Sequence, residues 1–245
     1  MPLRFISLFL HFIFKTHNFI SQGLKRVTVC VTLFLLCKFL HIDIAFCVIY
    51  NFYTNKGCAV QKIFGAIQDL LEAKEKVIIA IEGRSASGKT QLATFIESKI
   101  DCNVFCMDDF CLTDEQRKEK ERGFANLDVA RFRHEVIGGL QKQTAFDYDK
   151  FNCKQNVYSK FVVTQQKPVN IIEGTYSCCN ELRDYYDLKI FLKVDDVTQK
   201  IRLAEREPFE NMQQWLSWED DYFEKQNPEE VCDIICTSTL LFGND

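Results

Sequence analysis

Helical stripes and short apolar runs alternate along the chain from Val60 onward. In the first stripe the apolar residues recur three and four positions apart as far as Leu71, which predicts a helix that closes in the polar segment 73–76. Five apolar runs have the length of strands and lie at 77–82, 103–107, 169–173, 188–194 and 231–235. Helical stretches separate them, notably 91–100, 127–142 and 198–206. The pattern predicts strands that alternate with helices.

Between the run 77–82 and the stretch 91–100 the chain reads Gly-Arg-Ser-Ala-Ser-Gly-Lys-Thr, a complete G-x-x-x-x-G-K-T phosphate-binding loop. A strand before such a loop and a helix after it direct backbone N–H groups and the helix dipole at one phosphate. Lys89 would reach the β- and γ-phosphates, and the Thr90 hydroxyl would hold Mg²⁺. The other residues would supply the tight backbone path and its N–H groups: Gly83, Arg84, Ser85, Ala86, Ser87 and Gly88. The sequence therefore predicts that the chain binds a nucleoside triphosphate, ATP, with Mg²⁺.

Strands and helices that alternate after a phosphate loop are typical of the α/β class. We expect the fold of P-loop NTPases: a five-stranded, mostly parallel sheet with helices on both faces and a small lid. Ligands in such folds bind beyond the carboxyl ends of the strands, so the acidic residues at those ends are candidate site residues.

Two strand ends carry carboxylates. Transfer of a phosphoryl group to a hydroxyl needs a carboxylate that orients the hydroxyl and accepts its proton, and a metal ion on the phosphates. Asp108 follows the run 103–107 and is placed for the first task, while Asp109 would assist with Mg²⁺ or substrate. Glu173 ends the next strand and would be a further ligand of Mg²⁺. The alternative is that these acids are ordinary turn residues.

Arg202 and Arg206 lie four residues apart and share one face of a predicted helix. On a closing segment their guanidinium groups would neutralise charge on the transferring phosphoryl group. Surface pairing with Glu205 and Glu207 is the alternative.

Charge divides the 245-residue chain near residue 56. Residues 1–56 contain six Lys or Arg and only Asp43 as an acid, whereas the remainder has 24 basic and 33 acidic residues. Nine of the 22 Phe also lie in the first part. We therefore divide the chain into a hydrophobic, basic extension, 1–56, and a P-loop kinase domain, 57–245. The acidic domain shows no basic stripe interleaved with aromatics, which argues against nucleic-acid binding.

The segment 27–50 is long enough to span a bilayer, but it contains Lys38, His41 and Asp43 near its middle. Each charge there costs about 2.5–3.5 kcal/mol on insertion. Because most basic residues of the extension precede the segment, the positive-inside rule would also export the ATP-using domain. Three interpretations stay open: a poorly inserted membrane anchor, a targeting or pairing segment, and an upstream extension outside the working protein, which we favour.

The twelve Cys show no C-x-x-C pair and no zinc-like spacing with His. Scattered thiols in an ATP-using domain are typical of reduced, mostly buried Cys, and we expect a cytoplasmic protein.

Read together, these residues resemble the uridine kinase and phosphoribulokinase-like branch of P-loop kinases, especially small bacterial uridine kinase-like proteins. The resemblance covers roughly residues 60–236 and leaves residues 1–56 unmatched. It rests on the segments 81–90, 107–110, 126–128 with 131–133, 146–149, 172–177 and 185–191, and on the Arg202/Arg206 pair, in this order.

The resemblance implies a role for several residues. Asp108 would be the catalytic base, Asp128 would bind the sugar hydroxyls of the acceptor, and Tyr148 would lie against its base. Arg202 and Arg206 would belong to the lid. Uridine kinases place a His shortly after this Tyr, and here the region 149–153 reads Asp-Lys-Phe-Asn-Cys. Cys is a poor substitute as a hydrogen-bond partner, so uridine as the acceptor is less well supported than kinase chemistry.

The expected function is ATP-dependent phosphorylation of a hydroxyl on a small metabolite, with a nucleoside as the leading acceptor. The alternatives are another hydroxyl substrate, such as pantothenate or a sugar phosphate, and an ATP-binding regulatory protein without turnover. The choice between ATP and GTP and the oligomeric state stay open.

Overall fold

The computed structural model describes residues 57–113, 115–116, 127–142, 144–152, 157–163, 165–205 and 212–237. The extension 1–56, and with it the segment 27–50, lies outside these residues, so the boundary at 56/57 stays a prediction. The elements from α4 to β7 form one compact unit. No helix in the described part of the chain has the length and apolar character needed to cross a bilayer.

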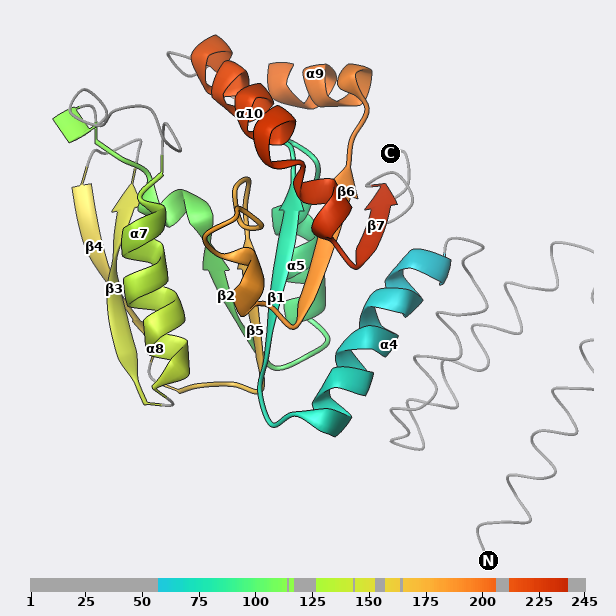
Figure 1. Ribbon diagram of the computed structural model, residues 1–245, viewed down its shortest axis with the longest axis vertical. Coiled ribbons are helices and arrows are strands. Elements are labelled where there is room, and N and C mark those ends of the chain that lie inside the picture. The colour runs from blue at the N-terminus through green and yellow to red at the C-terminus, as the bar shows by residue number, and fades with distance from the viewer. Residues whose placement is uncertain are drawn as a thin grey trace, which may run out of the picture. The chain divides into compact units, whose positions relative to one another are not determined.

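A five-stranded parallel sheet organises the unit (Figure 1). Its order is β2-β5-β1-β6-β7, and the strands are β1 (Val77–Gly83), β2 (Cys102–Cys106), β5 (Val169–Glu173), β6 (Leu188–Lys193) and β7 (Ile234–Thr237). All four pairings are parallel, with Ile79 opposite Ile171 on one side and Leu188 on the other. The phosphate-loop strand is therefore central, and the predicted fold class is confirmed.

Alternate residues of the central strands face two separate cores. Ile79 and Ile81 pack with residues of α4 (Gly57–Ala73) and α5 (Lys89–Glu97), both on one face of the sheet. Ala80 belongs to the second core, which also contains residues of α7 (Val129–Phe132), of the π-helical turn η2 (Arg133–Ile137) and of α8 (Gly138–Gln141). Period-two alternation within an apolar strand thus gives helices on both faces, as predicted.

The structure contains two elements that the sequence analysis did not predict. One is an antiparallel hairpin of β3 (Phe146–Asn152) and β4 (Val157–Val163), which lies beside α7 and α8 (Figure 1). The other is α10 (Met212–Gln226), which with α9 (Asp196–Ala204) lies above the carboxyl ends of β1 and β6. These two helices form the small lid.

Some predicted bounds shift for local reasons. The strand expected at 231–235 begins at Ile234, because Pro228 opens a 3₁₀ turn, η4 (Pro228–Val231), that uses the start of the apolar run. Met107 opens the 3₁₀ turn η1 (Met107–Phe110) instead of ending β2. A further short turn, η3 (Arg183–Tyr185), precedes β6. Seven of the described cysteines are free thiols, and five of these are buried: Cys102, Cys111, Cys178, Cys179 and Cys236.

Candidate active site

The phosphate loop lies between β1 and α5, and its backbone is held in an unusual conformation. Gly83 has φ 151°, and a Cβ there would lie only 2.4 Å from the carbonyl oxygen of Leu192. Gly88 has φ 96° as the N-cap of α5, and Ala86 adopts φ 62°. Left-handed backbone at a residue other than glycine costs on the order of 1–3 kcal/mol and persists only where the surroundings hold it. The contacts around this loop are therefore part of the site.

Lys89 and Thr90 begin α5 and face the loop and the next strand. The buried Lys89 Nζ donates to the carbonyl oxygens of Gly83 at 2.8 Å and Arg84 at 2.9 Å, and it contacts Thr175 Oγ1 at 3.3 Å. The Thr90 hydroxyl donates to Glu173 Oε1 at 3.1 Å. The backbone ladder of the helix starts with the bond from Leu92 N–H to Gly88 O, so the N–H groups before it have no helical partner. This is the usual arrangement of an anion site at a helix N-terminus.

Glu173 ends β5, between β1 and β2, where it is buried. Burial raises its pKa, while the nearby Lys89 ammonium opposes that rise and the charge of Asp108 adds to it. The ends of three adjacent strands thus bring Lys89 and Asp108 within electrostatic reach of Glu173. They lie at the carboxyl edge of the sheet, where the sequence predicts the site.

Glu82, the last residue before the loop, is completely buried. Its Oε1 accepts the N–H of Gly83 at 2.9 Å, and its Oε2 accepts the N–H of Cys178 at 2.7 Å and the hydroxyl of Tyr222 at 2.9 Å. Burial raises the pKa of Glu82 to about 7, against the effect of these donors and of Lys89. The carboxylate ties the loop to the segment after β5 and to α10.

Asp108 and Asp109 are adjacent in the turn η1, but they face different surroundings. Asp108 is exposed, and its charge is felt at Cys106 and Glu173. Asp109 is buried and lies 2.7 Å from Lys150 Nζ. Of these two carboxylates, Asp108 is the one open to solvent.

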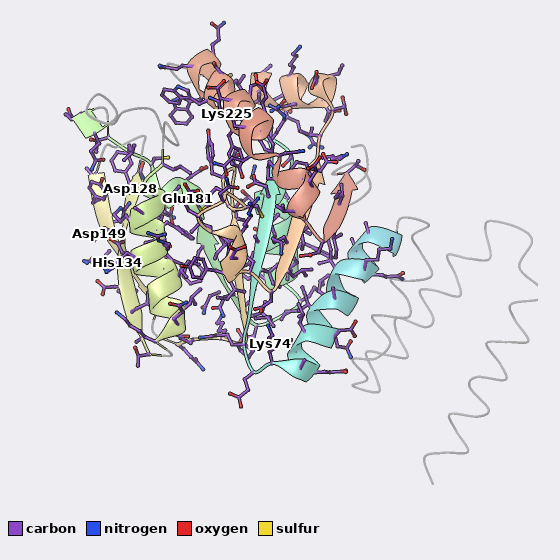
Figure 2. The ribbon with its side chains drawn as sticks, in the orientation of Figure 1. Lys74, Asp128, His134, Asp149, Glu181 and Lys225 are labelled. Atoms are coloured by element: carbon purple, nitrogen blue, oxygen red, sulfur yellow. The ribbon has the colours of Figure 1, made fainter. Side chains whose placement is uncertain are left out.

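Tyr148 and Asp128 join Asp109 to the hairpin and to α7. Tyr148 is only 2% exposed, its ring stacks on Phe110 with centroids 5.2 Å apart, and its hydroxyl donates to Asp109 Oδ2 at 3.0 Å. Asp128 caps α7 by accepting the Arg131 N–H at 3.2 Å. Figure 2 shows Asp128 at the upper end of α7 and Asp149 on β3. Roles for Tyr148 and Asp128 toward an acceptor stay predictions.

The lid contacts the loop through Arg202, which the sequence analysis named, and through two residues of α10 that it did not single out. Arg202 NH1 donates to Ala86 O at 3.1 Å, while Arg206 lies outside the described residues. Glu219 of α10 accepts the Ser85 N–H, and Tyr222 reaches Glu82. A signal existed in the sequence. Apolar residues follow a helical stripe along α10, and Glu219 is a charged residue on that stripe: Met212, Trp215, Leu216, Glu219, Tyr222 and Phe223.

The described residues contain no cluster of three or more His, Cys, Asp or Glu side chains suited to a metal ion. Mg²⁺ in phosphoryl-transfer sites takes oxygen ligands, often one or two from the protein and the rest from phosphates and water. The Thr90 hydroxyl and the Glu173 carboxylate, 3.1 Å apart, fit that requirement.

Several uridine kinases match this chain in sequence over at least half of its length. A uridine kinase of Ureaplasma parvum is 26% identical over 134 residues, which cover 50% of this chain and 65% of the relative. The match therefore spans just under two thirds of that protein. A uridine kinase of Lactococcus lactis subsp. cremoris is 30% identical over 150 residues, 55% of this chain and 70% of the relative. The chain belongs to the uridine kinase family.

A solved structure supports the fold of this family member. A possible uridine kinase from Bacillus stearothermophilus superposes with a TM-score of 0.52 at 22% identity, over 71% of this chain and 98% of the other. This similarity concerns the fold alone. No family model matches the chain. The fold is that of P-loop kinases, as the resemblance implies.

Proposed function

We propose that the chain transfers the γ-phosphoryl group of ATP to a hydroxyl of a small metabolite, with a nucleoside as the leading acceptor. The observation that carries the proposal is the convergence of Lys89, Glu173 and Asp108 at the ends of β1, β5 and β2. A loop for the donor phosphates, ligands for a metal and an exposed carboxylate are the parts that phosphoryl transfer requires.

On the donor side, ATP with Mg²⁺ would supply the transferable phosphoryl group. The N–H groups at the start of α5 would bind its phosphates, and the Lys89 ammonium would stabilise their charge. Thr90 and Glu173 would hold Mg²⁺. Arg202, and by extension Arg206, would neutralise charge from the lid side, since Arg202 already contacts the loop at Ala86.

On the acceptor side, Asp108 would orient the acceptor hydroxyl and take its proton. The proton leaves as the hydroxyl oxygen forms its bond to phosphorus, and ADP departs. Asp109, Asp128 and Tyr148 would bind the acceptor, directly or by shaping the wall formed by η1, α7 and β3. The ion pair between Lys150 and Asp109 gives this wall a polar character.

The test is an acceptor screen on the full chain with ATP and Mg²⁺, in which ADP and the phosphorylated product are measured by mass spectrometry. The panel contains uridine and other nucleosides, pantothenate and sugar phosphates. We expect a nucleoside monophosphate from the parent protein, and a rate at least about 10²–10³-fold lower from Lys89→Ala. Lys99→Ala, which removes an exposed Lys in the turn that follows the same helix, is the matched control.

Two outcomes would redirect the proposal. A product from pantothenate or a sugar phosphate alone would keep the kinase and replace the acceptor. Tight ATP binding without turnover of any acceptor would favour the second function, an ATP-binding regulatory protein.

A further inference from the structure

Glu219 is a charged side chain in a place where a charge is costly. It lies on α10 and is 3% exposed, and its two oxygens accept the Ser85 N–H at 3.1 and 3.0 Å. The Ser85 hydroxyl donates to Oε2 at 2.6 Å, and Gln199 Nε2 lies 3.3 Å from Oε1. A buried carboxylate is tolerated only where hydrogen bonds or opposite charge compensate for its lost hydration. Here the compensating donors come largely from the phosphate loop.

The contact belongs to a wider attachment of the lid to the first half of the loop. Gln199 of α9 also donates to Ser85 O at 3.0 Å, so both backbone groups of Ser85 are held. Arg84 NH1 lies 3.5 Å from Glu219 Oε1 and pairs with Asp220 at 2.5 Å. One turn further along α10, Tyr222 binds the carboxylate of Glu82.

This attachment does not occupy the backbone N–H groups in the second half of the phosphate loop, at Lys89 and Thr90. The Ser85 N–H points to Glu219, and the Ser87 N–H closes a turn on Arg84 O at 3.1 Å. The N–H groups of Lys89 and Thr90 precede the first backbone bond of α5 and have no helical acceptor. A bound phosphate would therefore use the second half of the loop, and Glu219 would hold the first half without competing for the same donors.

The backbone gives a reason for such a hold. Ala86, directly after Ser85, sits at φ 62°, a conformation that residues with a Cβ adopt only when their surroundings impose it. Ser85 is fixed on one side of Ala86 by Glu219 and Gln199, and Arg202 fixes the carbonyl of Ala86 itself.

We propose that Glu219 is a positioning residue, which fixes the first half of the phosphate loop from α10 so that the second half is preformed for the donor phosphates. The inference rests on the proposed function, since it assumes that the loop binds ATP. Helix α10 would thus contribute to ATP binding, although it lies outside the phosphate-loop motif.

The test compares Glu219→Gln and Glu219→Ala with Asp221→Asn, which removes an exposed carboxylate of the same helix that pairs with Lys225. ATP binding in the presence of Mg²⁺ is measured by calorimetry on the full chain, without an acceptor. We expect Glu219→Gln to weaken ATP binding about tenfold, which corresponds to the loss of one charge-assisted hydrogen bond, and Glu219→Ala to weaken it further. Asp221→Asn should bind ATP as the parent does.

A second readout separates positioning from general stability. In an acceptor assay KM for ATP should rise while KM for the acceptor stays unchanged, and a purely structural role would lower the melting temperature without this split. Ser85→Ala, which deletes only the hydroxyl contact and leaves α10 intact, should weaken ATP binding in the same direction by a smaller factor. It keeps the inference testable if the Glu219 variants do not fold.

The outcomes distinguish the two proposals. If the parent protein does not bind ATP, the proposed function fails. If the parent binds ATP and the folded Glu219 and Ser85 variants bind it equally well, only the positioning role is overturned. Tighter binding by Glu219→Ala would also overturn it, because Glu219 would then compete with the phosphates.

Discussion

The donor side and the acceptor side of the proposed site differ in how firmly their acidic groups are held. Around the loop, Glu82, Glu173 and Glu219 are all buried, and each accepts a hydrogen bond from the loop or the start of α5. On the acceptor side Asp109 is buried and held by Lys150 and Tyr148, but Asp108, the proposed base, is exposed. Strand β4 also presents Val157, Phe161 and other large apolar residues to solvent.

The difference has a chemical basis. The phosphates of a nucleotide have one shape, so a loop that binds them gains from being preformed. An acceptor must enter and leave, and its binding wall is built from local segments, the turn η1 and the hairpin. Four substitutions test this contrast.

The largest effect is expected from Asp108→Asn. A lost general base lowers kcat by about 10²–10⁴-fold, and because Asp108 lies in the turn η1 after β2 and outside the phosphate loop, the affinity for ATP should not change. Asp101→Asn, with an exposed side chain at the opposite end of β2, is the control. Product formation and ATP calorimetry are the measurements. Retained turnover would show that Asp108 is not the general base. Weakened ATP binding would show that Asp108 also acts on the donor side.

The second-largest effect is expected from a change in the backbone of the phosphate loop, on the donor side. Gly83→Ala places a Cβ against the Leu192 carbonyl at a positive φ, which should lower the free energy of unfolding by roughly 3 kcal/mol and weaken ATP binding. Gly65→Ala is the matched control, since nothing lies within 4 Å of a Cβ there. In the interior of α4 this second change should stabilise by about 0.5–1 kcal/mol. Urea unfolding measures both, and equal effects would contradict the proposed tight fit of the loop.

Glu82 should make stability depend on pH. Burial raises its pKa to about 7 from 4.5, so the folded chain binds the proton more tightly than the unfolded chain. The resulting stability is fully present below about pH 4.5 and is lost as pH rises to about 7, a change of roughly 3 kcal/mol.

Glu82→Gln cannot titrate, so the free energy of unfolding of the parent should fall relative to that of the variant as pH rises across this window. Denaturant unfolding at several pH values measures it. A difference that is constant with pH would show that Glu82 keeps an ordinary pKa.

The smallest effect is expected at the acceptor wall. Tyr148→Phe keeps the ring packed on Phe110 and loses the hydroxyl bond to Asp109, which should cost about 1 kcal/mol of stability and leave ATP affinity unchanged. Tyr158→Phe, at an exposed position of β4, is the control and should change neither quantity. A change in ATP binding by Tyr148→Phe would mean that the two sides are coupled.

The local pattern of apolar residues was sufficient to predict the sheet, but it did not predict the hairpin or α10. The five strands of the sheet were predictable because each lies in or beside a short, nearly continuous apolar run, and β1 and β5 are buried along almost their whole length, as central parallel strands require. The hairpin was not, because β4 is mostly exposed and β3 alternates imperfectly, with buried Tyr148 and Phe151 an odd number of residues apart. Helix α10 escaped prediction because its stripe is interrupted by Glu219, whose partner at Ser85 lies 134 residues away.

The phosphate loop, the strand ends that carry Asp108 and Glu173, and the α/β class could all be predicted from the amino-acid sequence. These features depend on neighbours along the chain: glycines at fixed spacing, an apolar run before them and a helix after them. The contacts that hold the loop become visible in the folded protein. The parallel order β2-β5-β1-β6-β7 brings the strand ends together, and the lid adds Gln199, Glu219 and Tyr222. The physical reason is that a buried charge is stable only with its partners in place, and those partners are brought near by folding.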